Sequence, residues 1–204
     1  MAAPPTEPPE TPAVTLRAFV ALALPPPWTQ ALAGLIRDLK DHAGKAAVRW
    51  VRPDQIHLTL RFLGQVAENQ IPRLTLVLGA ACAGLRPLTL SLGRPGAFPD
   101  RGAPRVLWIG LEGDLNPLHQ LQQKVDEATC GFGDHPEDRT FHPHLTLGRI
   151  PNPRTDPRGL REALARARLP SLPPWSVEEV CLLRSQLQPD GAHYTVLGRA
   201  GLTA

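Results

Sequence analysis

One tetrapeptide, HLTL, occurs twice in this chain of 204 residues, at 57–60 and again at 144–147. The copies start 87 residues apart, a little under half of the chain. Each stands in an apolar run typical of a β-strand, in which alternate side chains point to the same face. In each copy the histidine and the threonine therefore share one face, and the leucines share the other. The leucine face predicts packing against a core, and the polar face predicts a wet cleft.

An arginine follows each copy, and strict alternation assigns the two arginines to different faces. Arg61 falls on the face of the first histidine and threonine, whereas Phe62 falls with the leucines. Arg149 falls opposite the second histidine, so it is interpreted as structural unless a bulge intervenes. Alternation thus predicts that Arg61, and not Arg149, reaches the cleft.

The composition is that of a globular protein, with 42% hydrophobic and 20% charged residues. The formal net charge of +3 permits a phosphate-bearing partner, but the chain lacks the clustered basic stripe that indicates nucleic-acid binding by itself. Three widely spaced cysteines suggest neither a disulfide framework nor a zinc site, which predicts reduced cysteines and a cytoplasmic protein. No apolar run reaches the ~18–20 residues of a membrane span, and no signal peptide is recognisable. We therefore expect no membrane partner.

The pattern of apolar residues predicts alternating strands and helices. Strands are expected at 16–24, 48–51, 56–63, 88–92, 105–111, 141–150, 177–184 and 194–199. Helices are expected between Pro25 and Gly44 and at 67–85, 114–130 and 157–168. Gly/Pro-rich and polar segments at 93–104 and 131–140 are expected to be loops, and a turn is expected at 189–191.

Each half of the chain reads strand, helix, motif strand, helix, strand. We therefore expect an α+β fold in which residues 14–204 form a single bilobal domain, duplicated about a pseudo-two-fold axis and halved near 93–104. Two antiparallel sheets would face a central cleft, each with two helices on its outside. The last strand could cross to the opposite lobe. The Pro-rich segment 1–13 is expected to be a disordered tail.

Two facing imidazoles suit phosphoryl transfer without a metal, because histidine titrates near neutral pH. One of His57 and His144 would take a proton from an attacking water, and the other would protonate the leaving oxygen. Thr59 and Thr146 would hold the free phosphate oxygens, where charge develops in the transition state. Arg61 would add a guanidinium to this substrate-binding set. The residues alone do not assign acid and base.

Longer strings around these motifs resemble a known family. They are RAFVALALP at 17–25, IHLTLRFLG at 56–64, RVLWIGL at 105–111, FHPHLTLGR at 141–149 and LLRSQLQPDGAHYTVL at 182–197. Together they are similar to the RNA 2′,3′-cyclic phosphodiesterases, the LigT-like or ThpR group of the two-histidine (2H) phosphoesterases. The resemblance covers essentially everything after residue 14.

The resemblance implies a cofactor-free, metal-independent hydrolase that opens a 2′,3′-cyclic phosphate at an RNA 3′ end and leaves a 2′-phosphate. It implies that the histidine at 57 is the proton donor and the one at 144 the acceptor. Some members of the family also join or cleave 2′–5′ linkages in tRNA halves, so RNA derived from tRNA is one expected partner. We expect a monomer.

Aromatic residues offer candidates for stacking on a terminal base, namely Phe19, Trp108 and Tyr194. Each is more often part of a core. The loops at 93–104 and 131–140 would border the cleft and control access to it.

Three alternatives remain open from the sequence. A metal site could form from His57, His142 and His144 with Asp134 or Asp138, although no acidic residue recurs near both motifs. The chain could instead bind RNA ends without turnover. It could also be a phosphodiesterase that acts on a small cyclic nucleotide or a cyclic phospho-sugar.

Overall fold

The computed structural model describes residues 14–42, 48–134, 140–151, 157–188 and 191–203. The tail predicted at 1–13 lies outside the described residues, as do Asp138 and the rest of segment 135–139 in the loop predicted at 131–140. No helix in the described part of the chain has the length and apolar character needed to cross a membrane.

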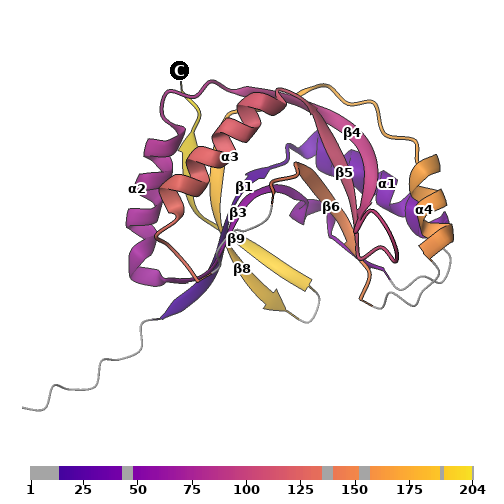
Figure 1. Ribbon diagram of the computed structural model, residues 1–204, viewed down its shortest axis with the longest axis horizontal. Helices are drawn as coiled ribbons and strands as arrows, with labels where there is room; N and C mark the ends of the chain where they lie inside the picture. Colours follow the sequence, from indigo (N-terminus) through magenta and orange to yellow (C-terminus); the bar gives the residue numbers. More distant parts are fainter. Residues whose placement is uncertain (1–13, 43–47, 135–139, 152–156, 189–190, 204) are drawn as a thin grey trace, which may run out of the picture.

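Strands and helices alternate along the chain much as the sequence predicts (Figure 1). The strands are β1 (Thr15–Ala23), β2 (Arg49–Trp50), β3 (His57–Ala67), β4 (Leu88–Phe98), β5 (Val106–Gly113), β6 (His144–Arg149), β7 (Trp175–Val177), β8 (Glu179–Gln188) and β9 (Gly191–Gly201). The helices are α1 (Pro26–His42), α2 (Ile71–Cys82), α3 (Leu115–Thr129) and α4 (Pro157–Arg166), with short 3₁₀ turns at Pro53–Gln55 and Glu68–Gln70.

The described strands form one curled antiparallel sheet, in the order β7-β4-β5-β6-β3-β1-β8-β9 with β2 added to β6 (Figure 1). The motif strands β3 and β6 pair at Leu58 and Leu145, and this contact joins the two halves of the sheet. The prediction of antiparallel strands covered by helices is thus confirmed. The prediction of two separate sheets is wrong, because β3 and β6 join the halves directly.

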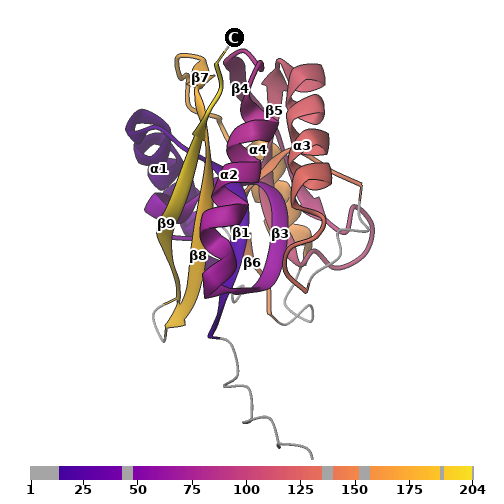
Figure 2. The same ribbon diagram turned by 90° about the vertical axis from the view of Figure 1, so that its left-hand side faces the viewer.

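Each half of the sheet takes strands from both halves of the sequence. β4 lies between β5 and β7, whereas β8 and β9 extend the sheet beyond β1. Figure 2 shows the yellow C-terminal strands beside the indigo N-terminal strand. β4 also continues to Phe98, so residues 93–98 are strand rather than the predicted loop. The internal duplication therefore remains a prediction, since strand exchange obscures the repeat of the sequence.

The helices pack in two pairs on the sheet. α2 and α3 contact each other over the half that contains β3 and β9, and α1 and α4 pack together near β4 (Figure 1). Between helices and sheet lies the main hydrophobic core, which includes fully buried Val20 and Leu58. Burial of such side chains is the dominant favourable term in folding. This core fixes one face of the motif strands and leaves the other face for the cleft.

The central strand β1 also carries apolar residues on its cleft face. Phe19 and Ala21 form a second, smaller cluster with Cys181 and Leu183 of β8, and Tyr194 packs on it. The two cysteines other than Cys130 are buried, and all three are free. The floor of the cleft beside β1 is therefore hydrophobic and closely packed.

Candidate active site

The pairing of the two motif strands brings both histidines to one cavity. An antiparallel register through Leu58 and Leu145 sets each histidine across from the threonine of the other motif. Both His57 and His144 line a cavity of about 630 Å³. The sequence could predict a shared face within each strand, but only the tertiary structure shows that the two faces meet.

A backbone hydrogen bond fixes the ring orientation of each histidine. Nδ1 of His57 lies 2.8 Å from the carbonyl oxygen of Gln55, and Nδ1 of His144 lies 2.6 Å from that of His142. A carbonyl oxygen can only accept, so both Nδ1 atoms carry the proton. In the neutral rings Nε2 is then the free nitrogen, able to take a proton or, once protonated, to give one.

Aromatic side chains pack around both imidazoles. The rings of Phe19 and Tyr194 lie 4.8 and 5.1 Å from that of His57. His144 has Phe98 at 5.1 Å and Trp108 at 6.2 Å. Trp108 can lie over β4 because a side chain at residue 96, which is glycine, would overlap its ring. These contacts remove water from the histidines on their side facing the sheet.

Burial lowers the pKa of both histidines. The pKa of His57 falls to about 4, because desolvation and the positive charges of Arg149 and His144 outweigh the hydrogen bond to Gln55, which raises it. Desolvation lowers the pKa of His144 as well, with Arg149 and His142 adding to the effect. At neutral pH both rings are therefore neutral in the free protein. A bound phosphate anion would raise both pKa values again.

Both threonines of the motifs line the same cavity. Thr59 and Thr146 are partly buried, whereas the leucines on either side of each are buried in the core. The hydroxyls thus flank the space between the histidines, as alternation within the strands predicts.

Arg61 does not reach the cleft, and its predicted place on the histidine face is wrong. In the pairing with β1, Val20 lies opposite Arg61 and Ala21 lies opposite Thr59, so Leu60 is an extra, bulged residue. The bulge turns Arg61 to the helix side, where it binds Asp126 of α3. Phe62, predicted to face the core, faces the cleft instead and lines the cavity.

Arg149 is the cation that alternation assigned to the wrong face. The pairing of β6 with β5 skips Leu147, because Leu107 pairs with Gly148 and Trp108 with Thr146. This second bulge brings Arg149 to the cavity. Gly148 was the available signal, since a glycine within a strand often marks a bulge.

A second cavity of about 550 Å³ adjoins the first beside His144. It shares Thr59, His144 and Arg149 with the first cavity, and His57 is not among its lining residues. Its aromatic lining consists of Phe62, Phe98 and Phe141. Of the stacking candidates, Phe19 and Tyr194 line the first cavity, whereas Trp108 packs against His144 without lining either.

Asp134, one of the two acidic candidates for a metal site, lines the first cavity together with both motif histidines. A carboxylate oxygen of Asp134 accepts a hydrogen bond of 2.7 Å from the backbone N–H of Gln65. Within the described ranges, no three His, Cys, Asp or Glu side chains are grouped as metal ligands.

Comparison with known proteins shows the family to which the chain belongs. The model of the 2′-5′ RNA ligase superfamily matches residues 24–189. An RNA 2′,3′-cyclic phosphodiesterase of Methanothermobacter thermautotrophicus is 34% identical over 88% of this chain and 95% of its own length. One of Thermus thermophilus is 35% identical over 92% and 90%. The crystal structure of E. coli LigT complexed with 3′-AMP, 27% identical, superimposes with a TM-score of 0.70 over 94% of this chain and all of LigT. The chain therefore belongs to the 2′-5′ RNA ligase superfamily, as one of its LigT-like phosphoesterases.

Proposed function

We propose that this protein hydrolyses the 2′,3′-cyclic phosphate at an RNA 3′ end to a 2′-phosphate, by two-histidine acid/base catalysis without a metal. The observation that carries the proposal is the pair of histidines in one cavity. In each, Nδ1 donates a hydrogen bond to a backbone carbonyl, which leaves Nε2 for proton transfer. The names of the relatives from Methanothermobacter and Thermus support the choice of substrate.

In the proposed reaction, water attacks phosphorus and the bond from phosphorus to the 3′ oxygen breaks. Nε2 of His144 takes the proton of the water, and Nε2 of His57 gives its proton to the 3′ oxygen. The family resemblance supports this assignment of roles. Each proton transfer typically contributes ~10²–10⁴-fold to the rate. His144 then releases to solvent the proton that it took from the attacking water. His57 takes up a proton from solvent, so both histidines return to their starting states.

We propose that Thr59, Thr146 and Arg149 hold the two non-bridging oxygens. The threonines lie across from the histidines, and the guanidinium lines both cavities. Donors aimed at these oxygens act mainly on the transition state, in which negative charge on phosphate is redistributed. Arg149 thereby takes the part that the sequence suggested for Arg61.

A nucleoside fits the aromatic side of the first cavity in this scheme. Phe19 and Tyr194 lie beside His57, the proposed donor to the 3′ oxygen, so the ribose and base would lie on their side. The complex of E. coli LigT with 3′-AMP supports a nucleotide as occupant of such a cleft. This arrangement favours an RNA end over a phospho-sugar.

A second candidate activity is the joining of RNA ends through a 2′–5′ linkage. In an in-line displacement the nucleophile enters opposite the leaving group, which is the His144 side in this scheme. The cavity there, about 550 Å³ with an aromatic lining, is far larger than a water needs. We propose that it admits the 5′-hydroxyl nucleoside of a second strand, including the partner half of a cleaved tRNA.

The test is a short RNA that ends in a 2′,3′-cyclic phosphate, incubated in EDTA with wild type and with His144→Ala. We expect conversion to the 2′-phosphate by wild type only. A 3′-phosphate product would contradict the regiochemistry, and loss of wild-type activity in EDTA would favour a metal enzyme. Binding without turnover in excess protein would instead indicate an RNA-end binding module.

A further inference from the structure

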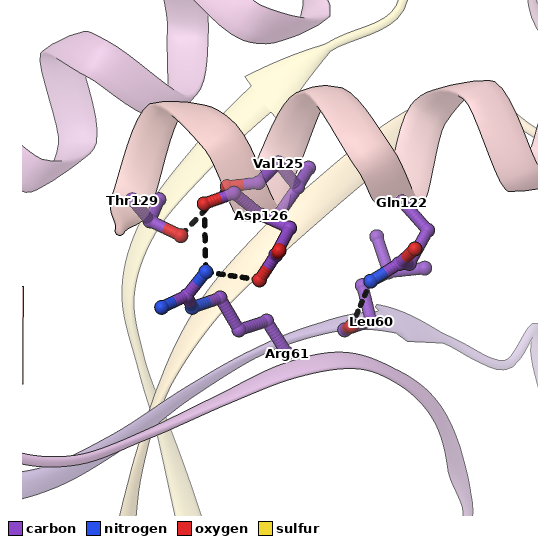
Figure 3. Close-up of polar contacts among 6 residues, drawn as sticks. All are labelled: Leu60, Arg61, Gln122, Val125, Asp126 and Thr129. Atoms are coloured by element: carbon purple, nitrogen blue, oxygen red, sulfur yellow. Dashed lines mark hydrogen bonds and ion pairs between the residues drawn. The ribbon is translucent and has the colours of Figure 1, made fainter. Parts of the chain in front are cut away.

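The bulge in β3 is bound to α3 by side chains from both elements. Nη1 of Arg61 donates to the carboxylate of Asp126 and, at 2.6 Å, to the backbone carbonyl of the same residue. Nε2 of Gln122 lies 3.5 Å from the carbonyl oxygen of Leu60 (Figure 3). Gln122 and Asp126 are four residues apart and so lie on one face of the helix. Both residues of the bulge are thus bound to a single helix face.

The anchor on the helix side is rigid. Leu118, Leu121 and Val125 of α3 are buried in the main core. The hydroxyl of Thr129 donates at 2.6 Å to the carbonyl oxygen of Val125 and is itself buried (Figure 3). Asp126 lies in the last turn of α3, where the helix dipole favours a cation. The Arg61 guanidinium therefore binds the carboxylate and the backbone carbonyl of Asp126, both of which are held in place by the packing of α3.

Arg61 needs this partner in order to stay where it is. Its side chain is 6% exposed, whereas that of Asp126 is 38% exposed. A buried guanidinium is unfavourable without a partner, and the cleft face would offer it water instead. The ion pair therefore favours the bulged strand over the regular one, in which Arg61 would face the cleft.

The bulge decides which side chains of β3 face the cleft, because a shift of one residue along the strand turns every following side chain to the other face. Thr59 is the last cleft-facing residue before the bulge, and Phe62 is the first after it. If the strand lost its bulge at Leu60, the hydroxyl of Thr59 would shift. Arg61 would then take the place of Phe62 in the cleft.

We propose that the Arg61–Asp126 pair, supported by Gln122, is a clamp that positions Thr59 for catalysis. Arg61 acts through Asp126 and does not touch the substrate, so it is a positioning residue. The inference rests on the proposed function, in which Thr59 holds a phosphate oxygen.

The first test is a double-mutant cycle on kcat with the cyclic-phosphate RNA. Arg61→Ala and Asp126→Ala should each lower kcat by up to about 100-fold, which a misplacement of about 1 Å can cost, and by no more than Thr59→Ala does. The double variant should lose no more than either single variant, and Arg61→Lys should recover part of the loss. Effects that multiply would overturn the proposal, because they would mean that Arg61 acts without Asp126.

A second cycle separates positioning from a general loss of structure. Thr59→Ala should cost little further in the Asp126→Ala protein, since the hydroxyl is already misplaced. Thr146→Ala is the matched control on β6. It should lower kcat by the same factor in the Asp126→Ala protein as in wild type. Equal behaviour of the two threonines would overturn the proposal.

Hydrogen exchange provides a readout that needs no turnover. In Asp126→Asn and in Gln122→Ala, which are milder changes, exchange should rise at the amides of 58–62 and stay unchanged at 145–149. Equal change in both strands, or no change in either, would overturn the clamp. If wild type fails to hydrolyse the RNA, the proposed function falls, and this measurement still decides whether α3 holds the bulge.

Discussion

The two motif strands carry their arginines one position apart, and this offset decides which arginine lies in the cleft. β3 continues from HLTL into Arg61, whereas β6 continues into Gly148 and then Arg149. Both strands bulge at the last leucine of the motif. The residue after the bulge faces the helices or core, and the next one faces the cleft. Arg61 and Gly148 occupy the first position, and Phe62 and Arg149 the second.

This difference shows that one fold detail can give identical motifs unequal roles. At the first position the arginine is itself buried and needs an anionic partner, and Asp126 provides it. At the second position an arginine lines the same cavity as both histidines, and its charge adds to the lowering of their pKa values by burial. The first motif thus contributes anchoring to α3, and the second contributes positive charge to the cleft.

The largest effect is expected from the histidines, which are common to both strands. His57→Ala and His144→Ala should each lower kcat by ~10²–10⁴-fold, because each removes one proton transfer. A substrate whose 3′ bridging oxygen is replaced by sulfur distinguishes their roles, since thiolate leaves without protonation. On it, His57→Ala should regain much of its rate and His144→Ala should not. The opposite pattern would exchange the roles of donor and acceptor.

The next largest effect is expected from Arg149. Arg149→Ala should lower kcat by ~10²–10³-fold, because it removes charge stabilisation from the transition state. Placing Phe62→Arg in that variant puts an arginine at the matching cleft position of the first motif and keeps the Arg61–Asp126 pair intact. Part of the lost kcat should return, while Phe62→Gln in the same variant serves as the uncharged control. No recovery would mean that the cleft position after the first bulge lies beyond reach of the phosphate.

A smaller effect is expected from the threonines. Thr59→Ala and Thr146→Ala should each lower kcat by ~10–10²-fold, with Thr→Ser as the control that keeps the hydroxyl. Steady-state kinetics on the cyclic-phosphate RNA measures both. A fall in affinity at unchanged kcat would show that the hydroxyls bind the ground state instead.

The smallest expected effect is on the pH dependence of kcat/KM and kcat. Burial disfavours the protonated rings, so a protonated histidine persists in the free enzyme only at lower pH than for an exposed one. The profile of kcat/KM should be bell-shaped with its maximum below pH 6.5. That of kcat should peak at higher pH, because the bound phosphate raises both pKa values. A flat profile between pH 5 and 9 would contradict two-histidine catalysis.

The sequence predicted most of the elements because apolar periodicity reports which face of each element is buried. It placed the four helices and the long strands within a few residues. It missed the continuation of β4 to Phe98, since glycine and proline there resemble a loop. It could not predict the joined sheet, because strand pairing depends on contacts between distant residues.

What the sequence determined by itself is the chemistry: two histidines and two threonines, each pair on one face of a strand with leucines behind it. Local alternation suffices for this, because each bulge falls at the last leucine of the motif, after the histidine and the threonine. What only the tertiary structure decided is the arginine. Whether Arg61 or Arg149 enters the cleft depends on bulges at Leu60 and Leu147, and these are set by pairing with β1 and β5 and by the carboxylate of α3. Such partners are distant in sequence, so alternation within one strand does not report them.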